Sequence, residues 1–163
     1  RIDNYYTFYD NNIRIFAVIL EAEICGRKTI MKNNLFKNTK SFIEQNSSIE
    51  EAVEKFKKEA EDTLVVLDNN FSIKGSVYKE DVLNYYEQNK NSRLFKKEKI
   101  SKLISIKKST IIMYPQNNIR DVLTLMNNMK PKAIAIANNP WEKKFLGIIM
   151  PKDLKNLKTS QSL

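Results

Sequence analysis

Residues 48–83 read SIEEAVEKFKKEAEDTLVVLDNNFSIKGSVYKEDVL, and this stretch decides the fold because residues 118–154 repeat its pattern as NIRDVLTLMNNMKPKAIAIANNPWEKKFLGIIMPKDL. In each copy, apolar residues at helical spacing are followed by two strand-like runs and a second helix start. The offset between the copies is 70 residues in the first half and 72 in the second, as four pairs show: Ile49 and Ile119, Thr63 and Ala133, Gly75 and Gly147, Asp81 and Asp153. A small insertion in the second turn explains the change, so the chain contains an internal repeat.

Local sequence signals define the elements of each copy. Ser48 and Glu51 form a capping box ahead of the first helix, and Asn118 can cap the matching helix of the second copy. The runs at 63–68 and 133–137 have the length and the apolar content of strands, and asparagine pairs follow both as turn residues. The pattern therefore predicts a helix, two strands and a second helix in each copy.

A short strand is also expected before each first helix, around 41–44 and 109–113. Each copy is then a β-α-β-β-α unit that cannot bury its sheet and its helices alone. We therefore predict an α/β (α+β) fold in which two such units pack with pseudo-two-fold symmetry. The predicted organisation is an N-terminal extension or linker, a first repeat, a basic linker with the start of the second repeat, the second repeat and a polar tail, at 1–38, 39–90, 91–108, 109–157 and 158–163.

The composition excludes several classes of function. The 163 residues include no histidine and a single cysteine, Cys25, which excludes histidine-based catalysis, His-ligated zinc and an internal disulfide. No other acid–base motif is present, so we predict that the chain is not an enzyme and has no catalytic or metal-binding residues. The longest apolar run, at 15–20, has six residues, whereas a membrane-spanning helix needs about 20. We expect a cytoplasmic protein or the cytosolic part of a membrane protein.

The net charge of +9 is unevenly distributed. Residues 90–108 contain eight basic residues and one glutamate, whereas residues 44–62 contain seven acidic residues and three lysines. A basic stripe can bind nucleic acid or an anionic membrane. Since no aromatic platform or nucleic-acid motif accompanies it, we favour a solvated linker and do not expect nucleic acid as a partner.

Each copy ends on a short motif that starts with glycine and ends with aspartate. Residues 75–81 read GSVYKED and residues 147–153 read GIIMPKD. On these residues the sequence resembles the CBS-domain family, whose members occur in tandem as a Bateman module, and the resemblance covers about 40–157. It implies a regulatory, non-catalytic pair that binds AMP, ADP or ATP, requires no cofactor and couples occupancy to a neighbouring domain.

The resemblance also implies roles for individual residues of the motif. Family members have Thr or Ser, which contacts phosphate, at the positions of Tyr78 and Met150, and Met150 has no hydroxyl. Asp81 and Asp153 occupy the positions that bind the ribose in the family. Since a carboxylate near a helix start is stabilising without any ligand, a purely structural role for both aspartates stays open.

In such modules each cleft combines the motif of one copy with the opening strand and the pre-strand turn of the other. The Asp81 cleft would face the lysines of the turn at 130–132, and the Asp153 cleft would face the carboxylates of the turn at 60–62. Opposite charge favours a nucleotide in the Asp81 cleft. The predicted ligand residues are Asp81, Lys79, Tyr78, Ile112, Tyr114, Lys130 and Lys132 in this favoured cleft, and Asp153, Lys152, Ile43 and Thr63 in the second.

The N-terminal extension gives a hint of a parent protein. Tyr9 and Asp10, followed by residues 13–15, resemble the stretch that joins the membrane part of CLC-family chloride channels and exchangers to their CBS pair. Residues 13–24 could form a strand or a buried helix, and periodicity does not decide between them. The expected partners are a second copy of the chain, bound through the CBS pairs, and an attached transporter or enzyme domain, with membrane contact only through a parent protein.

Three functions follow as hypotheses. The first is a cytoplasmic regulatory module that senses an adenine nucleotide and modulates an attached domain, for which a membrane ion transporter is the preferred candidate. The second is a ligand-free module for dimerisation or interaction, motivated by the missing hydroxyls at Tyr78 and Met150. The third is binding of nucleic acid or an anionic membrane through the basic stripe.

Overall fold

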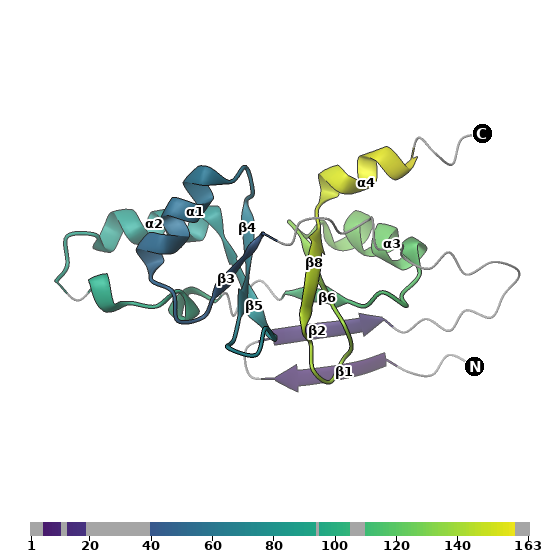
Figure 1. Ribbon diagram of the computed structural model, residues 1–163. Coiled ribbons are helices and arrows are strands. Elements are labelled where there is room, and N and C mark those ends of the chain that lie inside the picture. The colour runs from purple at the N-terminus through teal and green to yellow at the C-terminus, as the bar shows by residue number, and fades with distance from the viewer. Residues whose placement is uncertain (1–4, 11–12, 19–39, 94, 105–109, 159–163) are drawn as a thin grey trace, which may run out of the picture.

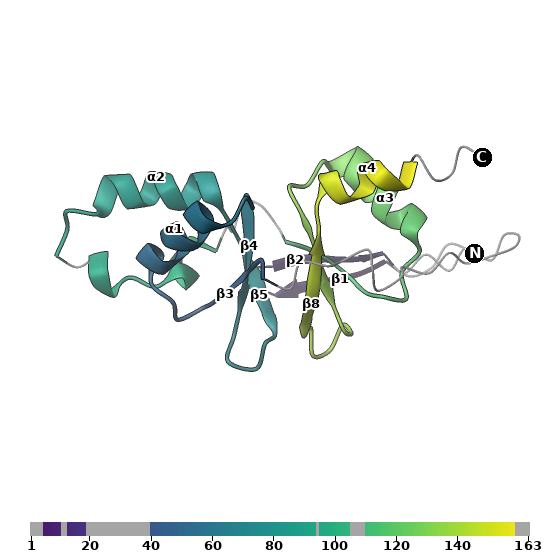
Figure 2. The same cartoon turned by 45° about the horizontal axis from the view of Figure 1, so that its top comes forward.

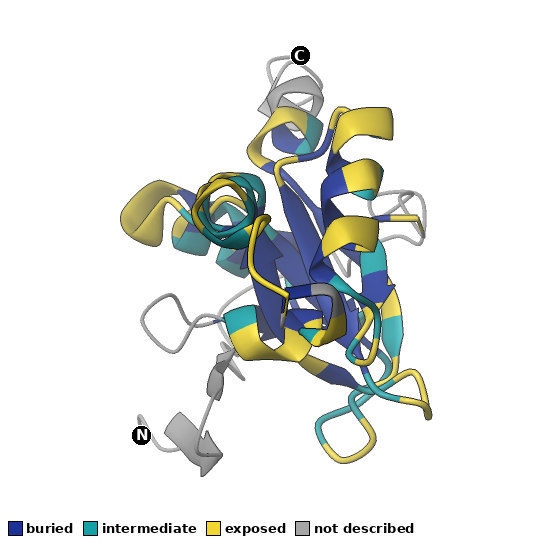
Figure 3. Ribbon diagram, turned by 90° about the vertical axis from the view of Figure 1, so that its left-hand side faces the viewer, coloured by how far each residue is buried: buried dark blue, intermediate teal, exposed yellow. Residues whose placement is uncertain are grey.

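The main part of the structure consists of two repeated units whose sheets face each other. The structure is a computed structural model, and it describes residues 5–10, 13–18, 40–93, 95–104 and 110–158 of the chain. Each unit contributes one three-stranded sheet. The sheets face each other at the centre, and the helices lie on the outer sides (Figures 1 and 2). Burial follows this layering, because the strands are buried and the outer faces of the helices are exposed (Figure 3).

The first repeat begins with a short strand and a capped helix. Its elements are β3 (Phe42–Glu44), α1 (Ile49–Lys58), β4 (Thr63–Leu67), β5 (Ile73–Tyr78) and α2 (Lys79–Asn89). The predicted capping box is present, because the Glu51 N–H donates to Ser48 Oγ at 3.1 Å and the Ser48 N–H donates to Glu51 Oε2 at 3.2 Å. The helix then buries Ile49, Val53 and Phe56 against the sheet.

The second repeat has the same order of elements. They are β6 (Ile111–Met113), α3 (Ile119–Met129), β7 (Ile134–Ala137), β8 (Phe145–Ile149) and α4 (Pro151–Lys158). Asn118 caps α3 as predicted, since its Oδ1 accepts from the Arg120 N–H at 3.0 Å. The helix ends at Lys130, whose backbone is left-handed with φ 45°, and Pro131 follows.

The two sheets have identical topology. In each, the first pair of strands is parallel and the second pair is antiparallel, in the orders β3-β4-β5 and β6-β7-β8. The antiparallel pairs also share an irregularity, between Val66 and Leu67 in the first sheet and between Ile136 and Ala137 in the second. These positions are related by the 70-residue offset of the sequence repeat. The predicted α/β fold with two β-α-β-β-α units is therefore confirmed.

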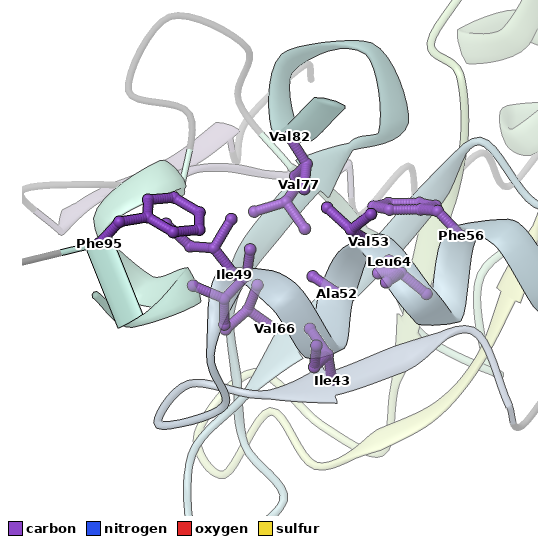
Figure 4. Packing of buried hydrophobic residues seen from close by; sticks show 11 residues of the cluster. Ile43, Ile49, Ala52, Val53, Phe56, Leu64, Val66, Val77, Val82 and Phe95 are labelled. Atoms are coloured by element: carbon purple, nitrogen blue, oxygen red, sulfur yellow. The ribbon is translucent and has the colours of Figure 1, made fainter. Parts of the chain in front are cut away.

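Three apolar clusters form the core, one between the two repeats and one within each repeat. One lies between the inward faces of the sheets and includes Val65 and Leu67 of the first repeat with Ile112, Ala135 and Ile148 of the second. The other two lie between each sheet and its own helices, and Figure 4 shows the one in the first repeat. Since burying one large apolar side chain contributes about 1.5–3 kcal/mol, the cluster between the sheets stabilises the packing of the two repeats against each other.

The basic segment after α2 is part of the first repeat's core. It forms two 3-10 turns, η1 (Phe95–Lys97) and η2 (Ile100–Leu103). Phe95 and Ile100 are buried in the cluster of the first repeat, and Glu98 accepts from the Tyr85 hydroxyl at 2.6 Å and from Lys102 Nζ at 2.8 Å. This part of the segment is therefore packed, and the interpretation as a solvated linker does not hold for it.

An antiparallel hairpin precedes the repeats. It consists of β1 (Tyr5–Asp10) and β2 (Ile13–Val18), and β2 lies against β6 (Figure 1). The structure thus resolves one alternative left open by the sequence, because residues 13–18 form a strand. The remainder of the 13–24 stretch lies outside the described residues.

Candidate functional site

The two repeats meet at one end of their sheets through ion pairs that cross from one repeat to the other. Lys152 at the start of α4 donates from Nζ to Glu61 Oε1, in the turn before β4, at 3.2 Å. Lys132 in the turn before β7 has its Nζ 3.6 Å from Glu80 Oε2 at the start of α2. Each pair joins the helix start of one repeat to the turn of the other, as expected for the two clefts.

A cavity of about 300 Å³ opens at the second cleft. It is lined by the turn before β4, by the start of α4 and by one lysine of the turn before β7: Ala60, Asp62, Thr63, Met150, Pro151, Lys152 and Lys132. Its volume lies at the lower end of the range typical of small-molecule sites. Two of the residues predicted for the second cleft, Thr63 and Lys152, are among its walls.

Asp153 lies one turn into α4 and is engaged with the backbone at the start of the helix. Its Oδ2 accepts from the Met150 N–H at 2.8 Å, and its own N–H donates to the Met150 carbonyl at 3.0 Å. Pro151, the first helical residue, has no N–H. The start of α4 therefore offers fewer free N–H donors to a phosphate than an ordinary helix N-terminus.

Tyr78, predicted for the first cleft, lies at the end of β5, directly before α2. The Tyr78 side chain is buried, and Lys132 Nζ lies 5.4 Å from the centre of its ring. Burial raises the pKa of the Tyr78 hydroxyl above its ordinary value, and the charge of the nearby Asp81 adds to the rise. Tyr78, Asp81 and Lys132 are thus brought together, and the lysine already has Glu80 and the ring as partners.

Ile112 and Tyr114, predicted for the first cleft, lie in the apolar cluster between the sheets. The Tyr114 hydroxyl is buried and has no hydrogen-bond partner among the described residues, and burial raises its pKa. Lys130 is exposed at the end of α3, and Lys79 is half-buried with its N–H donated to the Asp62 carbonyl at 3.0 Å. The residues predicted to bind a ligand in the first cleft therefore do not form one group. Tyr78, Asp81 and Lys132 lie together, Ile112 and Tyr114 lie in the core between the sheets, and Lys130 lies on the surface.

Ile43, predicted for the second cleft, is not among the residues that line its cavity. Ile43 packs in the cluster between the first sheet and its own helices, on the opposite face of β3 from the other repeat. Phe42, one residue earlier, is the side chain that packs against the inter-sheet cluster. Because successive side chains of a strand point to opposite faces, a shift of one residue along the strand selects the opposite face.

The sequence did not reveal the role of Glu61. We expected the carboxylates of its turn to repel phosphates, whereas Glu61 is buried and accepts from Lys152. The sequence repeat contained a usable signal, because Glu61 and Lys152 belong to the two segments that the predicted pairing of the repeats brings face to face. The pairing of these two charges could have been proposed from that topology.

Neither a metal centre nor a membrane-spanning element is found in the described part of the chain. No three His, Cys, Asp or Glu side chains in it lie close enough together to hold a metal ion. None of its helices is long and apolar enough to cross a bilayer.

The fold and the crossed clefts define a tandem β-α-β-β-α pair. Residues 28–88 match the family model for the CBS domain, which spans the first repeat, and both repeats together have the fold of a CBS domain pair. A search of curated proteins finds no significant match.

Solved structures with a similar fold come from several sources. Protein MJ1004 of Methanocaldococcus jannaschii has a TM-score of 0.66 and 16% identity, with 78% of this chain and 58% of that chain covered, so this chain spans somewhat more than half of that protein. A putative acetoin utilization protein of Vibrio cholerae has a TM-score of 0.65 and 14% identity, with coverage of 80% and 93%. The CBS domain pair of protein MJ0100, solved with 5′-methylthioadenosine and S-adenosyl-L-methionine, has a TM-score of 0.64 and 16% identity, with coverage of 83% and 100%.

Proposed function

We propose that this chain is a regulatory CBS pair that binds an adenosine-containing ligand in the cavity of the second cleft. The observation that carries the proposal is the cavity itself, which the turn of one repeat and the motif of the other enclose together. Because both repeats contribute walls, a bound ligand would bias how the repeats pack and so could signal to an attached domain. The MJ0100 pair, which shares the fold, was solved with two adenosine-containing ligands.

The charges around the cavity favour a ligand with few or no phosphates. Both lysines that line it have acidic partners, Lys152 with Glu61 and Lys132 with Glu80, and Asp62 is a wall carboxylate with no ion pair among the described residues. Met150 supplies no hydroxyl, and the start of α4 has few free N–H groups. Adenosine, 5′-methylthioadenosine or AMP therefore suits the cavity better than ATP.

This choice of cleft differs from the one that charge alone favours in the sequence. The Asp81 cleft has Lys132 and Lys79 nearby, but Tyr78 is buried at its phosphate position and Lys132 has other partners. The Asp81 cleft therefore becomes the alternative site, with AMP, ADP or ATP as its candidate ligands.

Calorimetric titration of the chain with adenosine, 5′-methylthioadenosine, AMP, ADP and ATP tests the proposal. We expect binding of the first three and the weakest signal for ATP. Met150→Thr should restore a phosphate-contacting hydroxyl and improve AMP and ADP binding relative to adenosine, whereas the matched change Tyr78→Thr should leave the order unchanged. No heat with any ligand at millimolar concentration would remove the sensor function.

A ligand-free interaction module is the second candidate. One carboxylate oxygen of Asp153, the predicted ribose partner, accepts a hydrogen bond from the Met150 N–H, which is a structural role. Under this alternative the pair would join two copies of the chain, and light scattering would give a dimer mass without any nucleotide. A monomer at all concentrations would exclude it.

The attached domain is proposed from the sequence alone. Tyr9, Asp10 and residues 13–15, which carry the resemblance to the CLC linker, form part of the β1–β2 hairpin. We propose a membrane ion transporter as the attached domain, with this chain on its cytosolic side. Reconstituted transport with and without the CBS pair, in the presence of the ligand, would test the coupling.

A further inference from the structure

The tips of the β4–β5 and β7–β8 hairpins form one joined surface at the end of the sheets away from the cavity (Figure 2). The Ile73 N–H donates to the Lys143 carbonyl at 3.0 Å, and the Phe145 N–H donates to the Phe71 carbonyl at 3.0 Å. The two repeats are therefore fixed to each other at their tips. We call this surface the hairpin ridge, which comprises residues 68–72 and 138–144.

The ridge exposes two large aromatic side chains. Trp141 is 82% exposed and Phe71 is 60% exposed, more than any other large hydrophobic residue in the described part of the chain. Both lie in the corresponding hairpin turns of the two repeats, although the direct structural counterpart of Phe71 is Lys143, since both of these residues have a left-handed backbone. Two protruding aromatic rings on one end of a folded pair indicate a surface that contacts something other than water.

The loops of the ridge hold these rings outward in a defined conformation. Asn139 Oδ1 accepts from the N–H groups of Trp141 and Glu142 at 3.0 and 2.8 Å, and Asn138 Oδ1 accepts from the Lys144 N–H at 2.8 Å. Phe71 has a left-handed backbone with φ 60°, which is unfavourable for a bulky side chain. The same left-handed backbone occurs at Lys143, with φ 53°, so it belongs to the turn geometry that the two hairpins share, and this geometry does not itself require an aromatic side chain.

The ridge and the adjacent Lys74 carry three basic side chains (Lys74, Lys143 and Lys144) and two acidic ones (Asp68 and Glu142). Asp68 is paired with Lys74 at 3.3 Å, and Glu142 accepts hydrogen bonds from Asn138 Nδ2 at 2.6 Å and Asn139 Nδ2 at 2.9 Å. Lys143 and Lys144 form no ion pair with any residue that the structure describes. The ridge thus combines two exposed aromatic rings with two adjacent ammonium groups, of which Lys144 also interacts electrostatically with Glu142.

We propose that the hairpin ridge docks on the surface of a bilayer that contains anionic lipids. Tryptophan is preferred at the headgroup level of membranes, and a lysine near an anionic surface contributes about 1 kcal/mol. A ridge with two protruding rings matches a deformable lipid surface better than it matches a rigid partner. This binding surface is distinct from both clefts and from the basic segment at 90–108, and it does not depend on the proposed ligand.

Trp141 is the only tryptophan of the chain, so its fluorescence reports on the ridge directly. The chain is mixed with vesicles of phosphatidylcholine, or of equal parts phosphatidylcholine and phosphatidylserine. We expect the emission to move to shorter wavelength and brominated acyl chains to quench it only with the anionic vesicles. Unchanged emission with both kinds of vesicle would overturn the proposal, as would sedimentation with the vesicles without any change in emission.

Paired variants separate the ridge from general charge. Lys143→Gln with Lys144→Gln should weaken vesicle binding by on the order of fivefold for each lysine. The control Lys57→Gln with Lys58→Gln removes the same charge from the exposed face of α1 and should have a much smaller effect. Phe71→Asn should weaken binding while the fold remains intact, because asparagine tolerates a left-handed backbone. Equal losses for the two lysine pairs would contradict the assignment of the ridge.

Discussion

The two clefts between the repeats are built from equivalent elements but carry their charges in opposite order. In the first cleft the turn supplies Lys132 and the helix start supplies Glu80, whereas in the second the turn supplies Glu61 and the helix start supplies Lys152. The Glu80 side chain is 71% exposed and the Glu61 side chain is 10% exposed. Duplication of one fold has therefore produced one pair that is mostly solvated and one that holds a buried carboxylate.

The residue three positions after the motif glycine also differs between the two clefts. Tyr78 brings a buried aromatic ring to the first cleft, and Met150 brings a flexible apolar side chain to the wall of the second cleft's cavity. A symmetric backbone therefore does not give symmetric sites. The side chains at a few equivalent positions decide which cleft has room for a ligand and which charge that ligand can carry.

The largest expected difference between the clefts concerns their ion pairs. Lys152→Met leaves the buried Glu61 carboxylate without this partner and should reduce the free energy of unfolding by about 1–3 kcal/mol. Lys132→Met removes an exposed pair and should cost less than about 1 kcal/mol. Urea unfolding of both variants measures the difference. Equal losses would mean that the burial of Glu61 has no energetic consequence.

A smaller effect is expected from the aspartate at the start of α4. Asp153→Ala removes the acceptor of the Met150 N–H and should destabilise the chain by about 1 kcal/mol. Asp153→Asn retains an oxygen acceptor and should lose clearly less. Thermal unfolding of the two variants makes the comparison, and an equal loss for both would rule out the hydrogen bond as the cause.

The smallest expected effect is the contribution of Tyr78, in the first cleft, to the loss of stability at alkaline pH. Since burial and the nearby Asp81 raise the pKa of Tyr78, the folded state favours its protonated form. The protonated Tyr78 hydroxyl therefore adds to the free energy of unfolding. This addition is fully present below about pH 10, the ordinary pKa of tyrosine, and it is lost as the pH rises through the pKa of Tyr78 in the folded state. Tyr78→Phe should therefore flatten the alkaline loss of stability.

The equivalent change in the second cleft serves as the control. Met150 does not titrate, so Met150→Leu should leave the pH profile unchanged. Chemical denaturation at a series of alkaline pH values measures both variants. A profile that Tyr78→Phe does not alter would show that other groups carry the alkaline transition.

The repeat in the sequence was enough to predict the fold, because each of its signals is local. The capping box at Ser48, the cap at Asn118 and the strand runs depend on neighbouring residues, and the structure contains all of them. The pairing of the two copies followed because neither could bury its own sheet. For these features local and global requirements agree.

The details of the clefts depended on information that the sequence carries only indirectly. Ile112, predicted to bind a ligand in the first cleft, packs between the two sheets, whereas Ile43, predicted for the second cleft, packs on the helix side of its sheet. Strand-face assignment in a three-residue strand such as β3 depends on a single position. The Glu61–Lys152 pair joins residues 91 positions apart and forms only once the repeats are packed. The N–H groups already used at the start of α4 likewise appear only in three dimensions.

The most direct test of ligand binding in the second cleft is to place a phenylalanine at the same repeat position in each cleft. Ala60 lines the cavity, and Lys130 is its counterpart 70 residues later. Titration of adenosine by calorimetry should show binding to the parent chain, loss of binding with Ala60→Phe, and retained binding with Lys130→Phe. Binding that survives Ala60→Phe and disappears with Lys130→Phe would contradict the account and place the ligand in the Asp81 cleft.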